Sequence, residues 1–327
     1  MSVLIKVPNS IALRNFDSVF KDNKTFYDNP GPISFYFHNK YIAMHPIGLA
    51  FYAALYDFYK INKIEVTGTL NRKISSIPYL QRMKLFAAMG FADPISINEH
   101  AETGRFIPLT KIRTNTDLTT FIKEIDPILH TDRQNSRVIK HVFSELLRNV
   151  LEHAGAPEGA NVCATYNKKR NKISIGISDA GIGIKKSLQI SHPVDNDTNA
   201  LILALTPGIT GSTPRLGGNS ENAGAGLFFT KCIAQTTRNH FLIYSGGSYF
   251  KLNLTPKNYL TFLNHNPKDD YGKLKSDLPS FQGTLVGIDI NINDNEVFNN
   301  LIEKIGTSYQ LGVKKSKKDY SQRIRFT

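Results

Sequence analysis

The segment from Glu145 to Ala154 reads Glu-Leu-Leu-Arg-Asn-Val-Leu-Glu-His-Ala, and it is the part of the chain that best predicts the fold. It ends a longer run of apolar side chains with helical spacing, which indicates a helix of roughly four turns packed on a core. Glu145 and Asn149 are four residues apart, so both lie on one face beside the apolar stripe. The stripe consists of Val138, Ile139, Val142, Phe143, Leu146, Leu147, Val150 and Leu151.

The chemistry of this pair suits a phosphate site. The amide oxygen of Asn149 is a fitting ligand for Mg²⁺, which binds oxygen and keeps several waters while it bridges phosphates. The Glu145 carboxylate, one turn earlier, can take a proton from an attacking water. An exposed Glu–Asn pair on a surface helix is the simpler alternative, and these two residues alone do not decide between them.

A second segment, Asp179-Ala-Gly181-Ile-Gly183-Ile184, follows a predicted strand over residues 172–179. The alternation along this strand places Asp179 on the apolar face, toward the helical layer. A carboxylate there needs a partner, because an unpaired buried charge is costly, and the exocyclic amine of adenine would supply one. Glycines at 181 and 183 allow a tight turn and close approach of the backbone. A plain β-turn is the alternative.

A third segment, Gly224-Ala-Gly226-Leu227, precedes an apolar helix over residues 227–234, whose first N–H groups are free to bind phosphate. Lys231 in this helix is expected on its surface, with a phosphate contact as the alternative. Between the second and third segments, residues 185–226 are rich in glycine, as functional lids or disordered loops are. A short helix that ends near Leu205 is predicted within this stretch.

The order of these three segments resembles the N, G1 and G2 boxes of the GHKL superfamily, which includes histidine kinases, gyrase-type topoisomerases, heat-shock chaperones and mismatch-repair ATPases. The resemblance covers residues 131–292 and implies a Bergerat-fold, histidine-kinase-like domain that binds ATP. It implies that Asn149 is the magnesium ligand and that Asp179 binds adenine. It also implies that Glu145 is the general base of the hydrolytic members. Kinase members carry an acidic residue at this position too, so hydrolysis does not follow from Glu145 alone.

The resemblance also implies roles for residues around the nucleotide. Thr284, after Gly283, matches the closing Gly-Thr of kinase-type ATP domains and is expected to hydrogen-bond near adenine through Asp179 or water. His153 has two open interpretations, a phosphate contact or a cation at the helix C-terminus. The remaining residues that the resemblance assigns to the nucleotide are Gly181, Gly183, Ile184, Gly224, Gly226 and Leu227.

Residues 1–112 predict a layered α/β unit with strands at 33–37 and 64–67 and helices at 46–59 and 78–90. This order loosely resembles a STAS domain, the fold of anti-sigma-factor antagonists. Phosphorylated members carry Ser or Thr before the glycine that opens the first helix, whereas Ile47 precedes Gly48 here. We therefore expect no phosphorylation at this helix. The unit is expected to bind a protein partner, and homodimerisation is an open alternative.

The rest of the pattern predicts an α/β fold. Further strands are expected at residues 162–166, 241–244, 249–252 and 284–290, with a hairpin turn at Gly246-Gly247. We expect a STAS-like α/β unit (1–112), a connection (113–130), a GHKL-type α/β sandwich (131–292), and a C-terminal helix with a basic tail (293–327). The mostly antiparallel sheet of the sandwich is expected to be covered by helices on one face.

Composition narrows the function classes. No apolar run approaches the ~18 residues of a membrane helix, and the first residues lack a secretory signal, so no membrane partner is expected. Two isolated cysteines, Cys163 and Cys232, favour a cytoplasmic protein. The net charge is +13, with lysines bunched at 168–169, 314–315 and 317–318. Solvated turns and a frayed tail explain these clusters, and nucleic acid is the alternative partner, without a recognition motif to support it.

Two GHKL classes are disfavoured by what the sequence contains. His130 and His141 lack the helical hairpin that carries a phospho-acceptor histidine, so a conventional sensor histidine kinase is not expected. The lysine context of gyrase-type enzymes is not found either. The expected function is a magnesium-dependent ATPase whose lid closure regulates a partner. An anti-sigma-type protein Ser/Thr kinase and a nucleotide-dependent binding module that does not hydrolyse ATP are the alternatives.

Overall fold

A seven-stranded antiparallel sheet lies at the centre of the computed structural model, with strand order β11-β10-β9-β12-β8-β7-β6. The structure describes residues 3–27, 31–38, 40–96, 106–129, 133–211, 213, 225–256, 258, 262–291 and 298–324. The strands are β6 (Phe106–Ile112), β7 (Ala160–Asn167), β8 (Lys172–Asp179), β9 (Phe241–Gly246), β10 (Ser248–Leu252), β11 (Gly272–Lys275) and β12 (Phe281–Asn291). The predicted α/β class, its antiparallel sheet and the β9–β10 hairpin are confirmed.

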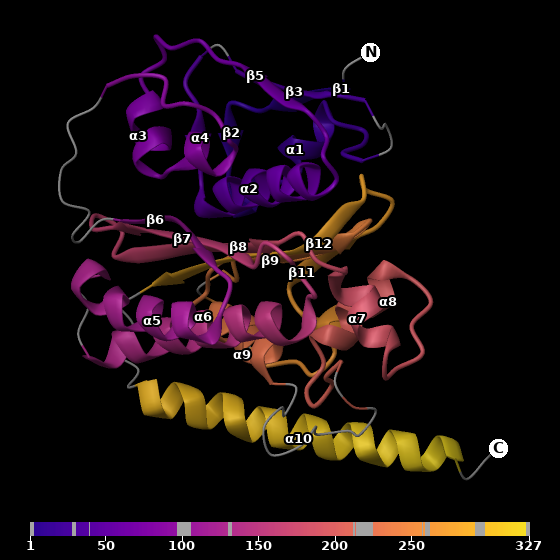
Figure 1. Cartoon of the computed structure of the whole chain (residues 1–327). Helices are drawn as coiled ribbons and strands as arrows, with labels where there is room; N and C mark the ends of the chain where they lie inside the picture. Colours follow the sequence, from indigo (N-terminus) through magenta and orange to yellow (C-terminus); the bar gives the residue numbers. More distant parts are fainter. Residues whose placement is uncertain are drawn as a thin grey trace.

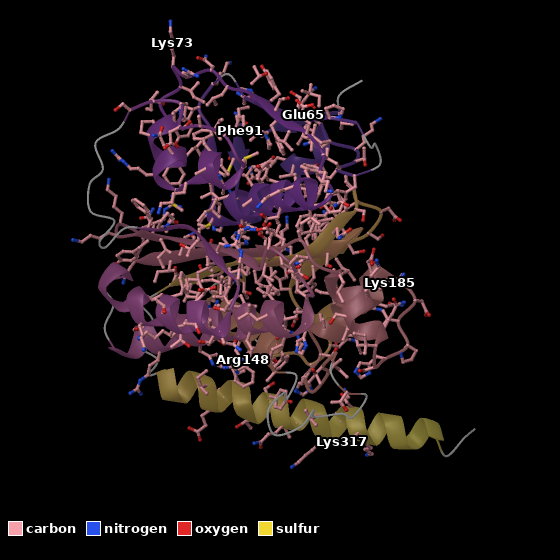
Figure 2. All side chains as sticks on the ribbon, viewed as in Figure 1. Glu65, Lys73, Phe91, Arg148, Lys185 and Lys317 are labelled. Atoms are coloured by element: carbon pink, nitrogen blue, oxygen red, sulfur yellow. The ribbon has the colours of Figure 1, made fainter. Side chains whose placement is uncertain are left out.

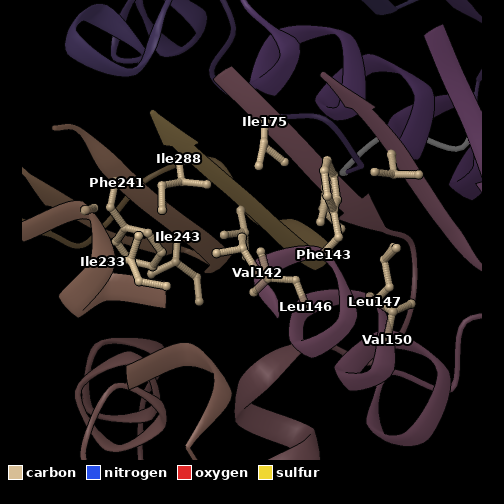
Figure 3. Packing of buried hydrophobic residues seen from close by; sticks show 14 of the residues in the cluster. Val142, Phe143, Leu146, Leu147, Val150, Ile175, Ile233, Phe241, Ile243 and Ile288 are labelled. Atoms are coloured by element: carbon tan, nitrogen blue, oxygen red, sulfur yellow. The ribbon is translucent and has the colours of Figure 1, made fainter. Parts of the chain in front are cut away.

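A layer of helices covers one face of this sheet (Figure 1). It contains α5 (Asn115–Leu129), α6 (Arg133–His153), α7 (Gly183–Gln189), α8 (Asp197–Ala204) and α9 (Gly226–Thr236), and α10 (Phe298–Ile324) runs along its outer side. The short 3-10 helix η2 (Pro267–Asp269) precedes β11. The predicted apolar stripe of α6 packs on the sheet, where Val142, Phe143 and Leu146 meet isoleucines of β8, β9 and β12 (Figure 3).

The N-terminal unit is a smaller α/β layer on the other face of the sheet (Figure 1). Its parallel sheet has the order β1-β3-β5, with β1 (Val3–Val7), β3 (Ile33–Phe37) and β5 (Val66–Thr69), and β2 (Ser10–Ile11) pairs with β4 (Ala43–Met44). Its helices are η1 (Leu13–Asn15), α1 (Ser18–Lys21), α2 (Pro46–Ile61), α3 (Ile77–Arg82) and α4 (Leu85–Ala88). The predicted helix over 78–90 is wrong as one helix, because Lys84 has a φ of +57° and separates α3 from α4.

Helix α2 lies directly on the large sheet, so the expectation of helices on one face only needs correction. The small residues Gly176 on β8 and Gly287 on β12 are cross-strand partners beneath it. A Cβ on Gly176 would lie 2.3 Å from the Pro46 carbonyl carbon, and one on Gly287 would lie 2.6 Å from Ile47 Cδ1. The first turn of α2, which includes the buried Ile47, therefore packs directly against the sheet.

The predicted boundary at residue 112 differs from the sheet pairing. Strand β6 lies inside the expected N-terminal unit in sequence, but it pairs with β7 and forms one edge of the large sheet. The expected connection over 113–130 holds α5, whose Phe121 packs edge-on against Phe143 of α6 at 5.2 Å. The helical layer thus begins before residue 131.

The chain end differs from a frayed tail. Helix α10 continues to Ile324, so the lysines at 314–318 lie on a helix. In the part of the chain that the structure describes, no helix has the length and apolar composition needed to cross a membrane. Both cysteines are buried and carry free thiols.

Candidate functional site

A cavity of about 280 Å³ lies between the helical layer and the large sheet. Its wall includes residues of α6, the end of β8, α7, the start of α9 and β12, together with the loop after α8. The three predicted segments therefore meet at one place. The predicted site residues that line the cavity are Glu145, Asn149, His153, Asp179, Gly183, Ile184, Gly226, Leu227 and Thr284. Gly181 does not line the cavity but donates its N–H to Asp179, and Gly224 lies outside the described residues.

Asp179 is the buried carboxylate of the cavity. Its phase on β8 matches the prediction, because Ile173, Ile175 and Ile177 of the same strand belong to the core under the helical layer. The Oδ1 atom accepts a hydrogen bond from the Gly181 N–H at 2.8 Å. The Oδ2 atom has no hydrogen-bond partner among the described residues, although Asp179 as a whole residue is only about 1% exposed. A buried acceptor without a partner is a group that a ligand can satisfy.

Burial dominates the electrostatics of Asp179. Desolvation raises the pKa of this carboxyl from 3.8 to about 7, and the backbone N–H groups of Gly181 and Thr284 oppose the rise without cancelling it. The cause is that a charged carboxylate loses its hydration in the interior. A donor brought by a ligand would stabilise the ionised form and lower the pKa again. A ligand that places a hydrogen-bond donor next to Asp179 Oδ2 is therefore favoured in this cavity.

Glycines fix the backbone around Asp179. A Cβ on Gly181 would lie 2.1 Å from the Ala154 carbonyl oxygen, so this glycine lets the turn pack against the end of α6. Gly183 has a φ of +77° and starts α7, as its predicted turn role requires. Gly283 has a φ of +101°, and a Cβ there would lie 2.1 Å from the Asp179 carbonyl oxygen. Each of these positions needs a residue without a side chain.

A serine that sequence reasoning missed ties these turns together. The Ser245 hydroxyl accepts from the Ile184 N–H at 3.0 Å and donates to the Gly283 carbonyl at 2.6 Å. It thus links β9, the start of α7 and the start of the last long strand. Ser245 carries no local motif, because its role depends on two segments that are distant in sequence.

The α6 wall carries the predicted polar pair. Glu145 and Asn149 both line the cavity, as their spacing predicts. Gly226, the first residue of α9, sits against them, since a Cβ there would lie 2.7 Å from Glu145 Oε2 and 3.4 Å from Asn149 Nδ2. The helix N-terminus of α9 therefore opens onto the same space as the Glu–Asn pair, with its first N–H groups available to an anion.

His141 is a second residue that sequence reasoning missed. It lies one turn before Glu145 on the cavity wall, and its Nε2 is buried without a hydrogen-bond partner in the described residues. Its ring packs edge-on against Phe229 at 5.8 Å. Burial lowers the pKa of His141, with the negative charge of Glu145 acting in the opposite direction. The i, i+4 spacing of His141 and Glu145 is the signal that could have found it.

The wall near the end of α6 carries charge. His153 is the last residue of α6 and lines the cavity, so the structure is compatible with both of its predicted roles. Arg148 also lines the cavity and lies 3.7 Å from Glu145 and 3.8 Å from Glu152. Its side chain is 47% exposed. Arg148 is thus a cation at the rim that sequence reasoning did not assign.

Lys231 requires a correction, because it is neither on the helix surface nor at the cavity. Its side chain is fully buried and forms an ion pair with Asp270 at 2.7 Å. Its Nζ also donates to the Asn264 carbonyl at 2.9 Å and lies 5.2 Å from the centre of the Phe228 ring. A buried cation with a paired carboxylate is a structural element. The contacts of Lys231 with Asn264 and Asp270 hold the 264–270 segment against α9.

The segment after Gly183 is partly built into the helical layer. The predicted helix ending near Leu205 is confirmed as α8, whereas α7 was not predicted. Asp197 at the start of α8 accepts from the Gly247 N–H at 2.8 Å. The Thr210 carbonyl is hydrogen-bonded to His192 at 2.9 Å, and Thr210 and Gly211 line the cavity. Of the predicted lid, residues 212 and 214–224 lie outside the described residues.

The side chains do not form a ready-made metal centre: within the described ranges, no three His, Cys, Asp or Glu residues come together. A cation at Asn149 would depend on this amide and on oxygens brought by water or a ligand. No protein-family model matches the sequence, and no curated protein matches it.

Proposed function

We propose that this protein binds ATP with Mg²⁺ and hydrolyses it, in the manner of the GHKL ATPases that its three segments resemble. The observation that carries the proposal is the Oδ2 atom of Asp179, a buried acceptor without a partner, in the same cavity as Asn149 and Glu145. Adenine has an exocyclic amine that can donate to this oxygen. The mostly apolar wall around it, including Ile177 and Ile184, suits a base.

The direction of the nucleotide follows from the order of residues along α6. Asp179 lies near the C-terminal end of α6, because the turn after it packs on the Ala154 carbonyl. From that end the wall presents Asn149, then Glu145, then His141. Four residues of helix rise about 6 Å. A triphosphate that starts at the adenine end would thus pass Asn149 before it reaches Glu145 and the first turn of α9.

Each residue then has a chemical task. The Glu145 carboxylate accepts a proton from water that attacks the terminal phosphate. The Asn149 oxygen would hold Mg²⁺, which supplies positive charge to the phosphates when it is bound. The N–H groups at the start of α9 donate to phosphate oxygens, and Gly226 leaves room for them beside Glu145. His141, adjacent to Glu145 on the helix, orients the carboxylate or the water.

The proposal includes a regulatory output, in which closure of the segment before α9 is sensed by a protein partner. The N-terminal unit is the candidate docking surface for that partner, and its loose resemblance to a STAS domain supports this. A cytoplasmic location is part of the proposal, supported by the two free thiols. Ile47 is covered by the sheet, which supports the expectation that the start of α2 is not phosphorylated.

A protein Ser/Thr kinase of the anti-sigma type is the second candidate, because Glu145 would serve equally well to deprotonate a hydroxyl. A binding module that does not hydrolyse ATP is the third. ATP labelled at the γ-phosphate separates the three. Free phosphate released by the isolated protein supports hydrolysis, label on a protein supports the kinase, and retained intact ATP supports the binding module. Undetectable ATP binding at millimolar concentration would refute all three.

A further inference from the structure

Helix α10 has one side that is occupied by the rest of the molecule. Ile305 is buried, and Tyr309 packs against Phe228 and Phe229 of α9 with ring centres 6.2 and 6.0 Å apart. Farther along, a Cβ on Gly312 would lie 2.6 Å from Pro207 Cγ, so α10 presses closely on the loop after α8. These contacts fix which side of α10 faces solvent.

The solvent side of α10 between Leu311 and Lys318 is strongly basic. Lys314, Lys315, Lys317 and Lys318 are all exposed, and no acidic residue lies between Leu311 and Lys318. Their spacing of one, three and four residues spreads the ammonium groups over the outer surface of little more than one turn. Figure 2 shows Lys317 projecting away from the body of the molecule.

We propose that this lysine surface of α10, residues 314–318, binds the phosphate backbone of a nucleic acid. This inference is independent of the ATP site. Charge complementarity with the phosphates supports it, since four cations lie together on one helix. The net charge of the whole chain, these lysines included, is +13. Lysine is a point charge on a flexible stem and not a planar fork. We therefore expect contacts to phosphates and little dependence on base sequence.

An anionic membrane is a less suitable partner for this surface. A helix that lies in a membrane interface inserts an apolar face, and the apolar side of α10 is used by α9 through Ile305 and Tyr309. Leu311, at 55% exposed, is the one exposed large hydrophobic residue of α10 within the described ranges. A single leucine does not form an inserting face.

The test uses the full-length protein without nucleotide and a fluorescein-labelled 20-nucleotide DNA, single-stranded and duplex, followed by anisotropy over a range of KCl concentrations. The variant replaces Lys314, Lys315, Lys317 and Lys318 with glutamine. A matched control replaces Lys73, Lys168, Lys169 and Arg170 with glutamine, which removes the same charge from exposed positions on other elements. Figure 2 shows Lys73 at the opposite end of the molecule.

We expect wild type to bind with a salt dependence that the α10 variant largely loses. Each phosphate contact contributes about 0.7 to the slope of log K against log salt for single strands, so four contacts contribute about 3. The α10 variant should bind at least about tenfold more weakly at low salt, whereas the control variant should stay close to wild type. A four-arginine variant at the same positions should retain binding.

Several outcomes would overturn the proposal. An equal loss in the α10 and control variants would mean that net charge alone attracts DNA. No binding of DNA or of a matching RNA at 50 mM KCl would also refute it. Binding to phosphatidylserine vesicles but not to nucleic acid, with loss in the α10 variant, would assign the surface to membranes instead. If the glutamine variant does not fold by circular dichroism, the Lys314→Gln/Lys317→Gln pair gives the same comparison with half the slope change.

Discussion

Asp179→Asn should weaken nucleotide binding and yet stabilise the free protein above neutral pH. The substitution keeps the shape of the side chain and keeps Oδ1 as an acceptor for the Gly181 N–H. It replaces the partnerless Oδ2 with an NH₂ group, which cannot accept a hydrogen bond from adenine. Losing a hydrogen bond to a charged group costs about 1.5–3 kcal/mol. ATP affinity should therefore fall by roughly tenfold to a hundredfold.

The stability change follows from the raised pKa. A native pKa of about 7, against 3.8 in the unfolded chain, means that the folded state holds the extra proton between those values. The contribution of Asp179 to stability is thus fully present below pH 4 and is lost as pH rises through 7. One pKa unit corresponds to about 1.4 kcal/mol, which sets a ceiling of about 4 kcal/mol. An unpaired amide donor costs about 1–3 kcal/mol, so the net gain at pH 8 should be about 1–3 kcal/mol.

A second buried aspartate provides the matched control. Asp289 lies on β12 with its side chain on the opposite face of the sheet, where it is held by His45, Lys172 and Ser174 at distances of 2.5–3.0 Å. Burial acts to raise the pKa of Asp289, but the hydrogen bonds and charges of His45 and Lys172 hold it below its ordinary value. Asp289→Asn should therefore destabilise the protein at pH 8. This loss should shrink as pH falls toward the native pKa.

Urea unfolding of the nucleotide-free proteins at pH 5 and pH 8 measures both effects, and calorimetry with ATP and Mg²⁺ measures affinity. The two substitutions should change the unfolding free energy in opposite directions at pH 8. The Asp179→Asn gain should disappear at pH 5, where the wild-type carboxyl is protonated. Equal destabilisation by both substitutions at pH 8 would show that Oδ2 of Asp179 has a partner. Unchanged ATP affinity in folded Asp179→Asn would remove the adenine assignment.

Three further outcomes test the site. Glu145→Gln should keep ATP affinity but slow phosphate release by about 10²–10⁴-fold, and equal turnover in this variant and wild type would exclude Glu145 as the base. Asn149→Ala should lose the magnesium-dependent part of ATP binding, as measured by calorimetry. ATP affinity should rise between pH 6 and pH 8 as Asp179 ionises. Binding should release a proton, which makes the binding heat depend on the buffer. An ATP affinity of wild type that does not change with pH would contradict this. A non-hydrolysable ATP analogue should slow amide hydrogen exchange at Gly208–Gly211 and in the first turn of α9, while exchange at the centre of α6 should not change. Identical exchange with and without the analogue would argue against closure of the cavity around the nucleotide.

The sequence was sufficient where one element carries the whole signal. The helical stripe of α6 predicted both its buried face and the shared face of Glu145 and Asn149. The alternation of β8 predicted that Asp179 points into the helical layer. These patterns depend only on the 3.6-residue and two-residue periods of the backbone. The side-chain directions that they predict hold in any fold that buries the apolar face of the element.

Interactions between distant segments could not be predicted in this way. The sequence predicts Lys231 on the helix surface because its partner, Asp270, is 39 residues away, just after η2. Strand β6 belongs to the large sheet because of its pairing with β7, although in sequence it lies inside the expected N-terminal unit, residues 1–112. Ser245 has a role that arises only when the start of α7 and the last long strand approach it. In each case the decisive contact is absent from the local pattern.

The packing of α2 leads to a final prediction, that residues 106–327 will not fold without the N-terminal unit. The face of the large sheet under α2 contributes Cys163, Leu242, Tyr244, Tyr249, Phe281 and Leu285 to the core of the N-terminal unit, and each is at most 1% exposed. Exposing side chains of this kind costs about 1.5–3 kcal/mol each. Their sum is on the order of 10 kcal/mol, which equals the whole stability of a typical domain.

The fragment of residues 106–327 should therefore aggregate or bind a hydrophobic dye, and it should show no cooperative urea transition. Residues 1–96 expressed as a separate chain in the same cells should restore a soluble complex, because the missing face is supplied in trans. Polar contacts cross the same interface, including the Lys111–Asp57 ion pair and the Ser178 hydroxyl that donates to the Ala50 carbonyl at 2.6 Å. A monomeric fragment with a cooperative transition and wild-type ATP affinity would show instead that the N-terminal unit is a separable domain. The close fit of α2 against Gly176 and Gly287 argues that it is part of the support for the site.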